Sequence, residues 1–430
     1  MVHMLLAGVV LLAVLALVVL RPRGLAVAWP AGIGAVVVLL LGLLSLPALV
    51  TIFRDTWDAA ATLIALFLLS EALDSNGFFT WAALHLARAA RGSGWRLYAA
   101  MLLLTTGVTA LLANDGAVLM LTPIFAVLLT RIYTKEQLRL PFVFAAGFFA
   151  DAMSGLFVPS NLTNIILAGA THLPFAQVAL WMALPTLCAF LMGSTAFALR
   201  FRRQLCVSYE AGVVESPETA IRDWPVFWAG IGALGFLVVG YIIGGELRLP
   251  VSLVAGTAAL AMLALVRVCG LRPVGEMLRA APWSILIYAL GMFVVITAAY
   301  DAHLLRFVTE PLRANVMPQA GPRGALVAGS ITALLAAAVN NLPATLIGVL
   351  ALRSASHISA MAIYAIMLGV DIGPKLTPFG SLATLLWMGI LERHGIHISW
   401  RRYLRENWWV TLLVLGAAFA GLLAANVLLG

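Results

Sequence analysis

Residues 369–384 read Gly-Val-Asp-Ile-Gly-Pro-Lys-Leu-Thr-Pro-Phe-Gly-Ser-Leu-Ala-Thr, a polar and helix-breaking stretch inside the apolar segment 362–391. A charge within an apolar span costs about 2.5–3.5 kcal/mol on insertion scales, so it usually marks a functional position. Irregular backbone at membrane depth is tolerated only where it is buried in protein or lines a polar cavity. The stretch therefore predicts a broken membrane helix whose interruption borders a functional cavity.

The composition of the whole chain places this stretch in a membrane. Of 430 residues, 63% are hydrophobic and 10% are charged, whereas soluble domains carry about a quarter charged residues. Long apolar runs fit helical spans of about 20 residues, not the alternating polarity of a membrane β-barrel. The net charge of +8 comes from scattered basic residues without a nucleic-acid-reading motif. We therefore predict an all-α polytopic protein whose partner is the lipid bilayer, and no nucleic acid.

Polar residues recur at matching positions in two halves of the chain. In each half, an interrupted apolar stretch is followed by an interrupted helix in which an aspartate precedes two polar residues by 10 and 13 positions. In the apolar stretches, Asn114-Asp115 matches Asn340-Asn341. In the interrupted helices, Asp151 with Asn161 and Asn164 matches Asp371 with Ser381 and Thr384. Several matches in the same order indicate an internal repeat.

Each half is predicted to contain five transmembrane helices, one of them broken, and one re-entrant hairpin. An odd number of crossings inverts the second half relative to the first, as in many secondary transporters. The predicted boundaries are 1–200 for the first repeat, with its hairpin at 97–131 and broken helix at 142–170, then 201–223 for a cytoplasmic linker, and 224–430 for the second repeat, with its hairpin at 325–352 and broken helix at 362–391.

Basic residues set the predicted orientation. With the N-terminus outside, nineteen of the 26 basic residues fall in cytoplasmic segments and six fall outside, in agreement with the positive-inside rule. The segment from Met1 to Leu20 lacks a basic n-region and is predicted to stay as the first span rather than be cleaved as a signal peptide.

Five charged residues are predicted inside the membrane, and all but Glu71 lie at or beside the interruptions. They are Glu71, Asp115, Asp151, Asp371 and Lys375. Lys375 follows Asp371 by four residues, a spacing that allows a salt bridge. A structural role is the alternative for each of them, because acidic and amide side chains also cap half-helices and satisfy freed backbone groups.

Two hairpin tips and two broken helices predict a shared cavity near the bilayer midplane. Half-helix N-termini offer N–H groups and partial positive charge, and asparagine offers donors and acceptors, so the cavity suits a small oxygen-rich solute. Carboxyl groups facing it favour proton coupling, since a carboxylate removed from water takes up a proton more readily. The predicted substrate-binding residues are Asn114, Asp115, Gly116, Asn161, Thr163, Asn164, Asn340, Asn341, Ser381 and Thr384, and the predicted coupling or gating residues are Asp115, Asp151, Asp371 and Lys375.

At these residues the chain resembles the bacterial ArsB family of arsenite efflux permeases, within the ion transporter superfamily, over essentially its full length. The resemblance is carried by residues 111–117, 160–164 and 340–343, and above all by 369–387. It implies an inner-membrane protein that exports trivalent arsenite and antimonite in exchange for protons by an elevator movement. It also implies that a separate ArsA-type ATPase can assist where the host encodes one.

The cysteines bear on how arsenic would be held. Cys188, Cys206 and Cys269 are scattered without metal or disulfide spacing, and Val370 stands where some family members have cysteine. We therefore expect neutral As(OH)₃ or Sb(OH)₃ to be held by hydrogen bonds, with no metal site and no cofactor.

Three other functions are weighed against this one. A sodium- or proton-coupled carrier of another ion, such as a dicarboxylate, would want several cationic groups, whereas the predicted core offers only Lys375. A passive channel is the second alternative, but a channel would not need the pair of titratable residues that the sequence provides. A membrane enzyme is disfavoured because the sequence has no metal-ligand cluster, no nucleophile–base arrangement and no phosphate-binding loop for ATP hydrolysis.

Overall fold

The computed structural model describes residues 2–355 and 357–429. Every regular element in this part of the chain is a helix. Ten helical segments within it are long and apolar enough to cross a membrane by length and composition. The all-α membrane-protein class predicted from composition is therefore confirmed.

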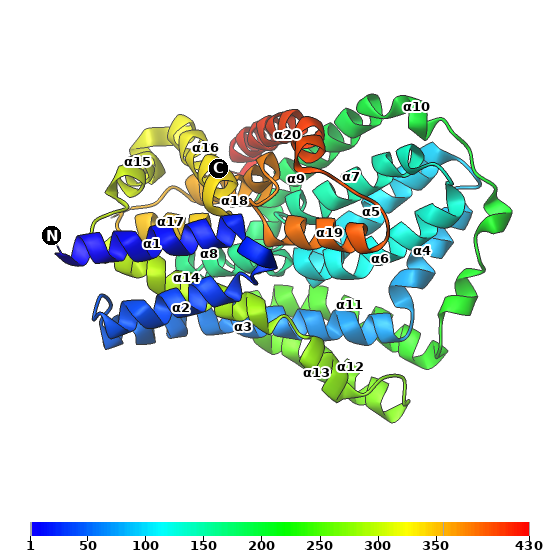
Figure 1. The fold of residues 1–430 in the computed structure, drawn as a ribbon, viewed down its shortest axis with the longest axis horizontal. Helices are drawn as coiled ribbons and strands as arrows, with labels where there is room; N and C mark the ends of the chain where they lie inside the picture. Colours follow the sequence, from blue (N-terminus) through cyan, green and yellow to red (C-terminus); the bar gives the residue numbers. More distant parts are fainter. Residues whose placement is uncertain (1, 356, 430) are drawn as a thin grey trace.

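The longer helices form two packed groups. In Figure 1, most helices of one group lie in a lower layer and most helices of the other lie in an upper layer. In the first, the scaffold group, α3 packs against α12 and α14 against α2. In the second, the hairpin group, α9 packs against α20 and α16 against α18. The scaffold group consists of α1 (Val2–Leu20), α2 (Ala28–Leu40), α3 (Leu46–Ser75), α11 (Trp224–Glu246), α12 (Val251–Val268), α13 (Val274–Ala280) and α14 (Trp283–Asp301). The hairpin group consists of α5 (Gly94–Leu112), α6 (Asn114–Ile132), α7 (Glu136–Ala152), α8 (Leu162–Thr171), α9 (Phe175–Arg200), α10 (Arg202–Leu205), α16 (Gly321–Val339), α17 (Asn341–Arg353), α18 (Ala360–Ile372), α19 (Leu382–Arg393) and α20 (Trp400–Leu429).

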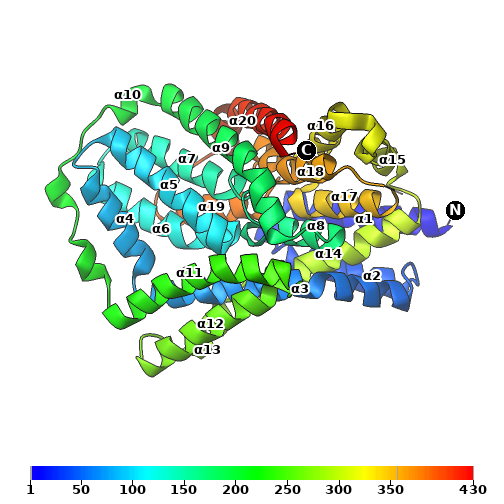
Figure 2. The same ribbon diagram turned by 180° about the vertical axis from the view of Figure 1, so that it is seen from behind.

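Two short helices lead from the scaffold group into the hairpin group at opposite ends of the molecule. They are α4 (Phe78–Ala89), before α5, and α15 (Arg306–Val316), before α16. Figures 1 and 2 show the α5–α6 pair in one half of the molecule and the α16–α17 pair in the other, with the turns of both pairs directed towards the middle.

Each helix pair turns at a single residue with left-handed backbone. Ala113 (φ 67°) joins α5 to α6, and Asn340 (φ 87°) joins α16 to α17. Positive φ is uncommon for residues other than glycine, although asparagine tolerates it better than most. The turns therefore lie at the start of the predicted interruptions, and Asn114 and Asn341 already begin the returning helices.

The two broken helices are interrupted where glycine and proline are concentrated. Residues 153–161 separate α7 from α8 and include the 3₁₀ turn Val158–Ser160, and residues 373–381 separate α18 from α19 and include the 3₁₀ turn Gly373–Leu376. Proline stands near the start of both turns. Pro374 follows the end of α18 at Ile372 with only Gly373 between them, and its missing N–H and fixed φ prevent that α-helix from continuing, whereas α7 has already ended at Ala152, before Pro159. The helix α8 then restarts with Asn161 as its cap, because Asn161 Oδ1 accepts from the backbone N–H of Thr163 at 3.2 Å.

The second and third predicted spans have different bounds in the structure. The sequence pattern predicts spans at 27–48 and 57–74, whereas α2 ends at Leu40 and α3 already begins at Leu46. Gly42 takes a positive φ of 64°, and Ser45 caps the next helix by accepting from the N–H of Ala48. This turn ends α2 early, and α3 extends through the polar residues that the prediction left in a loop.

Close packing of α16 against α18 makes Gly369 a test of the fold. A Cβ at Gly369 would overlap the carbonyl oxygen of Gly329 and Oγ1 of Thr332, and the first of these is backbone that cannot easily move. We expect Gly369→Ala to destabilise the protein by about 1–3 kcal/mol, the usual cost of overpacking, seen as a lower unfolding temperature in detergent. Gly256→Ala, at a helical position with open space, is the matched control and should not lower it.

Candidate functional site

Both hairpin turns and both helix breaks border one internal cavity. The volume of this cavity that is open to the centre of a water molecule is about 20 Å³. That volume is enough for about one water. A solute with three hydroxyl groups is larger and requires the surrounding elements to separate. The lining residues are Asn114, Asp115, Asn161, Leu162, Thr163, Ile285, Tyr288, Asn341, Leu342, Ser381 and Leu382.

The structure brings most of the predicted binding residues to this cavity. Those that line it are Asn114, Asp115, Asn161, Thr163, Asn341 and Ser381. The other four lie beside it: Gly116 faces Ser70 of α3, Asn340 forms the turn of the second hairpin, Asn164 donates to Asp371, and Thr384 accepts from Lys375.

Asp115 is the carboxyl group that faces the cavity directly. It lies in the first turn of α6 and is 8% exposed. Within the described residues, no hydrogen bond or ion pair involves its carboxylate, although its backbone takes part in the helix. A helix N-terminus favours a negative side chain, but the charge of Asp115 has no cationic partner there.

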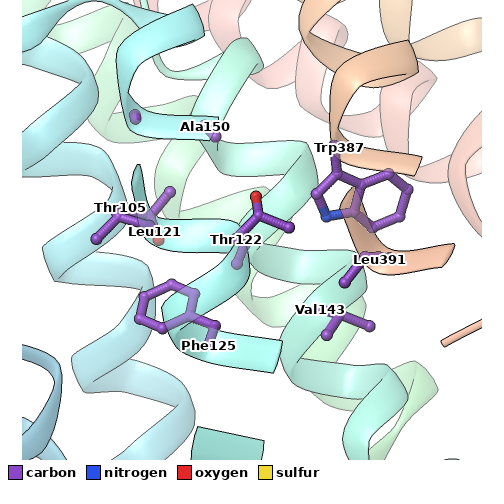
Figure 3. Close-up of a pocket in the computed structure, with 10 residues that line it drawn as sticks. Thr105, Leu121, Thr122, Phe125, Val143, Ala150, Trp387 and Leu391 are labelled. Carbon is purple, nitrogen blue, oxygen red and sulfur yellow. The ribbon is translucent and has the colours of Figure 1, made fainter. Parts of the chain in front are cut away.

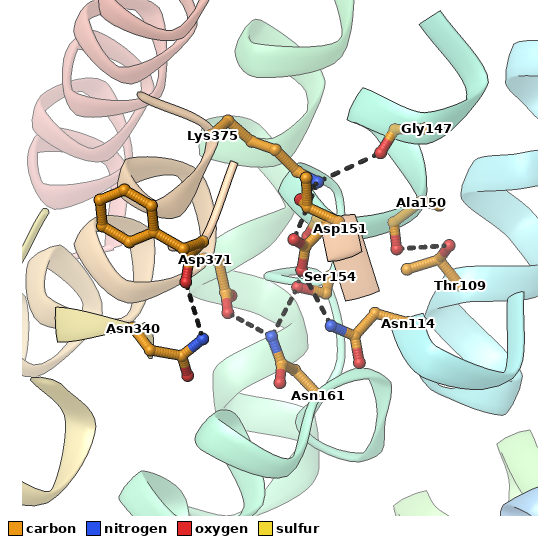
Figure 4. A network of polar contacts seen from close by, with 12 residues as sticks. Thr109, Asn114, Gly147, Ala150, Asp151, Ser154, Asn161, Asn340, Asp371 and Lys375 are labelled. Carbon is orange, nitrogen blue, oxygen red and sulfur yellow. Dashed lines mark hydrogen bonds and ion pairs between the residues drawn. The ribbon is translucent and has the colours of Figure 1, made fainter. Parts of the chain in front are cut away.

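A buried ion pair lies behind the cavity (Figure 4). Lys375 Nζ lies 2.9 Å from Asp151 Oδ2 and donates to Thr384 Oγ1 at 2.8 Å and to the carbonyl oxygen of Gly147 at 3.2 Å. Asn114 Nδ2 donates to the other carboxylate oxygen of Asp151 at 2.9 Å. Lys375 and Asp151 are both excluded from solvent. Their opposite charges and their hydrogen bonds compensate the cost of burying the two groups.

The salt bridge that the spacing of Asp371 and Lys375 allows is therefore not formed, because Lys375 pairs with Asp151. Residues four apart share a face only within a continuous α-helix, and α18 ends at Ile372. The 3₁₀ turn that follows carries Lys375 away from Asp371 and towards α7. The partner of Lys375 comes from the first half of the chain, more than 200 residues earlier.

Asp371 is bound by neutral donors instead. Its carboxylate accepts from Asn161 Nδ2 at 2.9 Å, from Asn164 Nδ2 at 2.8 Å and from Thr163 Oγ1 at 3.4 Å. Figure 4 shows Asn161 extending between Asp371 and Ser154. The polar residues of α8 thus recognise the aspartate of the other broken helix, and Asn161 connects it to the cavity.

Two lining residues from α14 are absent from the predicted set. Tyr288, fully buried, donates its hydroxyl to Asn340 Oδ1 at 3.3 Å, and Ile285 lies one turn earlier in the same helix. The available signal is weak, because Tyr288 is one of three hydroxyl-bearing residues within the apolar run 283–299, with Ser284 and Thr297. Tyr288 is the contact through which the scaffold group reaches the second hairpin turn.

A second, smaller cavity lies within the hairpin group (Figure 3). It is lined by residues of α5, α6, α7 and α19, including Thr105, Thr122 and Trp387. Trp387 packs directly on Gly147, where a Cβ would overlap its indole ring.

Glu71, the charged residue predicted inside the membrane but away from the interruptions, lies within α3 and pairs with Arg272. This ion pair agrees with the structural alternative given for Glu71.

An all-helical membrane protein whose hairpin turns and broken helices enclose a polar cavity has the architecture of a secondary transporter. The model of the ArsB family, described as arsenical pump membrane protein, matches residues 6–425. The chain belongs to this family. Arsenical pump membrane proteins of Escherichia coli and Yersinia enterocolitica are each 37% identical over 423 residues, covering 97% of this chain and 98% of each relative.

The fold is also found in a solved structure. The crystal structure of the Alcanivorax borkumensis YdaH transporter superposes with a TM-score of 0.53 and 15% sequence identity, covering 87% of this chain and 86% of that one. At this identity the likeness concerns the fold. Family membership, together with the ten apolar segments, makes the chain an integral inner-membrane protein.

Proposed function

We propose that this protein exports trivalent arsenite and antimonite from the cytoplasm, as neutral hydroxides, in exchange for protons. The observation that carries the proposal is the cavity between the hairpin turns, where amides and hydroxyls, together with apolar side chains, surround one carboxyl group, Asp115, that has no ion-pair partner in the described residues. Membership of a family of arsenical pump proteins supports the substrate class.

The cavity chemistry favours a neutral solute with several hydroxyl groups. Each hydroxyl of As(OH)₃ donates and accepts, and the lining amides offer both functions. Ser381 Oγ has no hydrogen-bond partner in the described residues. Lys375, six residues before the lining residue Ser381, is engaged by Asp151, so the site offers little to a doubly charged dicarboxylate. None of the cysteines lines the cavity.

Proton exchange is supported by the carboxyl groups in and beside the cavity. In this scheme, protonation of Asp115 and release of the solute alternate, because an ionised carboxylate accepts hydrogen bonds from As(OH)₃ whereas the protonated group accepts fewer. Asp151, Asp371 and Lys375 form the surrounding coupling or gating network. Asn114 and Asn161 link this network to the cavity, since each lines the cavity and donates to one of the two buried aspartates.

An elevator movement of the hairpin group against the scaffold group is the proposed transport step. The two hairpins enter from opposite ends of the molecule (Figures 1 and 2), as two inverted repeats would require. The groups meet at few polar contacts, among them Tyr288 with Asn340 and an ion pair of 2.6 Å between Arg353 of α17 and Asp55 of α3. In the proposed orientation the N-terminus lies outside, which the positive-inside pattern favours.

Flux through proteoliposomes that contain only this chain tests the function. We expect arsenite and antimonite to accumulate against their gradients when a proton gradient is imposed, without sodium and without ATP. Accumulation that follows sodium instead would indicate a different coupling ion. Equilibration without accumulation would indicate a channel, and a requirement for an added ATPase would show that the chain alone is not an antiporter.

A further inference from the structure

The two halves of the chain differ in how the negative charge of their equivalent aspartates is balanced. When Asp151 and Asp371 are aligned, the position four residues later is Gly155 in the first half and Lys375 in the second. Lys375 places its ammonium group 2.9 Å from Asp151 Oδ2. Gly155 has no side chain, so the first half supplies no equivalent cation for Asp371.

Asp371 is a buried carboxylate without a cation from the chain. It is 0% exposed, and its hydrogen-bond donors are the neutral side chains of Asn161, Thr163 and Asn164. In the described residues, no Lys, Arg or His nitrogen lies within salt-bridge distance of it. A buried charge left uncompensated is strongly destabilising, so a positive charge from outside the protein would stabilise an ionised Asp371 beyond what its three hydrogen bonds provide.

Unpartnered oxygen atoms lie beside this carboxylate. Asn164 Oδ1 and Thr186 Oγ1 are buried and have no hydrogen-bond partner in the structure. The orientation of Asn164 is determined, because its Nδ2 donates both to Asp371 Oδ2 at 2.8 Å and to the carbonyl oxygen of Ser154 at 3.0 Å. Both of those partners are acceptors, so Oδ1 must be the free end of the amide.

Gly155 lies between Thr186 and Asp371, and Met182 Cε fills the position beside it, 2.9 Å from an ideal Cβ, so an occupant larger than a proton requires the flexible Met182 side chain to move. An ideal Cβ at Gly155 would lie 3.4 Å from Asp371 Oδ2 and 3.8 Å from Thr186 Oγ1, with the flexible Met182 side chain as its closest neighbour. The carboxylate and the free hydroxyl therefore flank the position whose counterpart in the second half is Lys375. A carboxylate oxygen, a free hydroxyl and a missing positive charge define an incomplete cation site, next to an amide of Asn164 whose oxygen is also free.

We propose that Asp371, Asn164 and Thr186 form a site for an exchangeable monovalent cation, a proton or a sodium ion, in place of the fixed ammonium group that Lys375 provides to Asp151. Asp151 stays ionised through the cycle, whereas Asp371 gains and loses its cation. The charged groups that share this core with Asp371 are Asp151 from α7 and Lys375 from the 3₁₀ turn, paired with each other, and Asp115 from α6. Use of this cation in exchange rests on the proposed function, but its binding does not.

Cation binding can be measured on the purified full chain without any arsenical. The infrared carbonyl band of protonated carboxyl groups is recorded against pH, and the unfolding temperature is recorded in sodium chloride and in choline chloride. A bound proton predicts an acid band that is missing from the spectrum of Asp371→Asn. A bound sodium ion predicts stabilisation by sodium but not by choline, which is lost in Asp371→Asn. The proposal is overturned if the wild type shows neither response, or if Asp371→Asn retains the response.

Two further variants separate a cation ligand from a structural residue. Glu276→Gln should keep the wild-type response, because Glu276 is an exposed carboxylate on α13, outside the hairpin group. Thr186→Val removes an unpartnered hydroxyl. If that hydroxyl binds the cation, half-saturation should shift by about fivefold, the equivalent of one hydrogen bond of about 1 kcal/mol.

Thr186→Val also provides the test if Asp371→Asn fails to fold. An unchanged half-saturation in Thr186→Val would remove Thr186 from the site. If half-saturation shifts as expected while proteoliposomes show no proton-driven arsenite flux, the proposed function fails and the cation site stands.

Discussion

Replacing Asp115 by asparagine is expected to abolish proton-driven antimonite uptake into everted membrane vesicles, down to the level of vesicles that lack the protein. The substitution keeps the size of the side chain and its ability to form hydrogen bonds, but removes the group that can exchange a proton. Asp115 lines the cavity and has no ion-pair partner in the described residues, so the loss of its charge should not leave another buried charge unpaired. The protein should therefore still insert and fold.

The control for this experiment is a surface carboxylate changed in the same way. Glu276 lies on α13 with 61% of its side chain exposed, and Glu276→Gln should transport as the wild type does. Immunoblots of the vesicles must show equal amounts of both variants. Unaltered uptake by Asp115→Asn at equal abundance would remove Asp115 from the mechanism.

Removing the ammonium group of Lys375 is expected to have the largest effect on stability. Lys375→Met leaves the fully buried carboxylate of Asp151 without its cation, and breaking a buried pair in this way costs about 3–5 kcal/mol. The unfolding temperature of the purified protein in detergent should fall sharply, and little folded protein should be recovered.

The matched double variant distinguishes a lost charge from a lost shape. Asp151→Asn combined with Lys375→Met removes both charges, so most of the lost stability should return, because a neutral pair carries no uncompensated charge. A double-mutant cycle on unfolding temperatures then measures the coupling between the two residues. If the double variant is as unstable as Lys375→Met alone, the pair is not what holds this region together.

Much of the fold could be predicted because its signals are local. Apolar runs of span length identify the membrane helices, and proline, glycine and asparagine within them identify the hairpin turns and helix breaks. The same logic located Asp115 and Asn341 at the cavity, since a polar residue inside an apolar segment must be buried against other polar groups or water. The early end of α2 was missed because the turn at Gly42 lies within a continuous apolar pattern.

The partners of the buried charges could not be predicted in this way. The chain spacing suggested Asp371 as the partner of Lys375, yet a broken helix does not keep its side chains in helical register, and the rotation at Gly373 and Pro374 turns Lys375 towards Asp151. Tyr288 was missed for a related reason. Nothing near it in the sequence shows that, of the two tyrosines on α14, Tyr288 meets the turn of the second hairpin.

The amino-acid sequence by itself determined that this protein is a helical membrane protein with two sets of polar interruptions, because hydrophobicity and backbone preference act over a few neighbouring residues. Only the tertiary structure decided that Asp151 has a fixed cation, whereas Asp371 has none among the residues that the structure describes. That difference depends on contacts between residues more than 200 positions apart, which form only when α7, α8 and the break after α18 pack together.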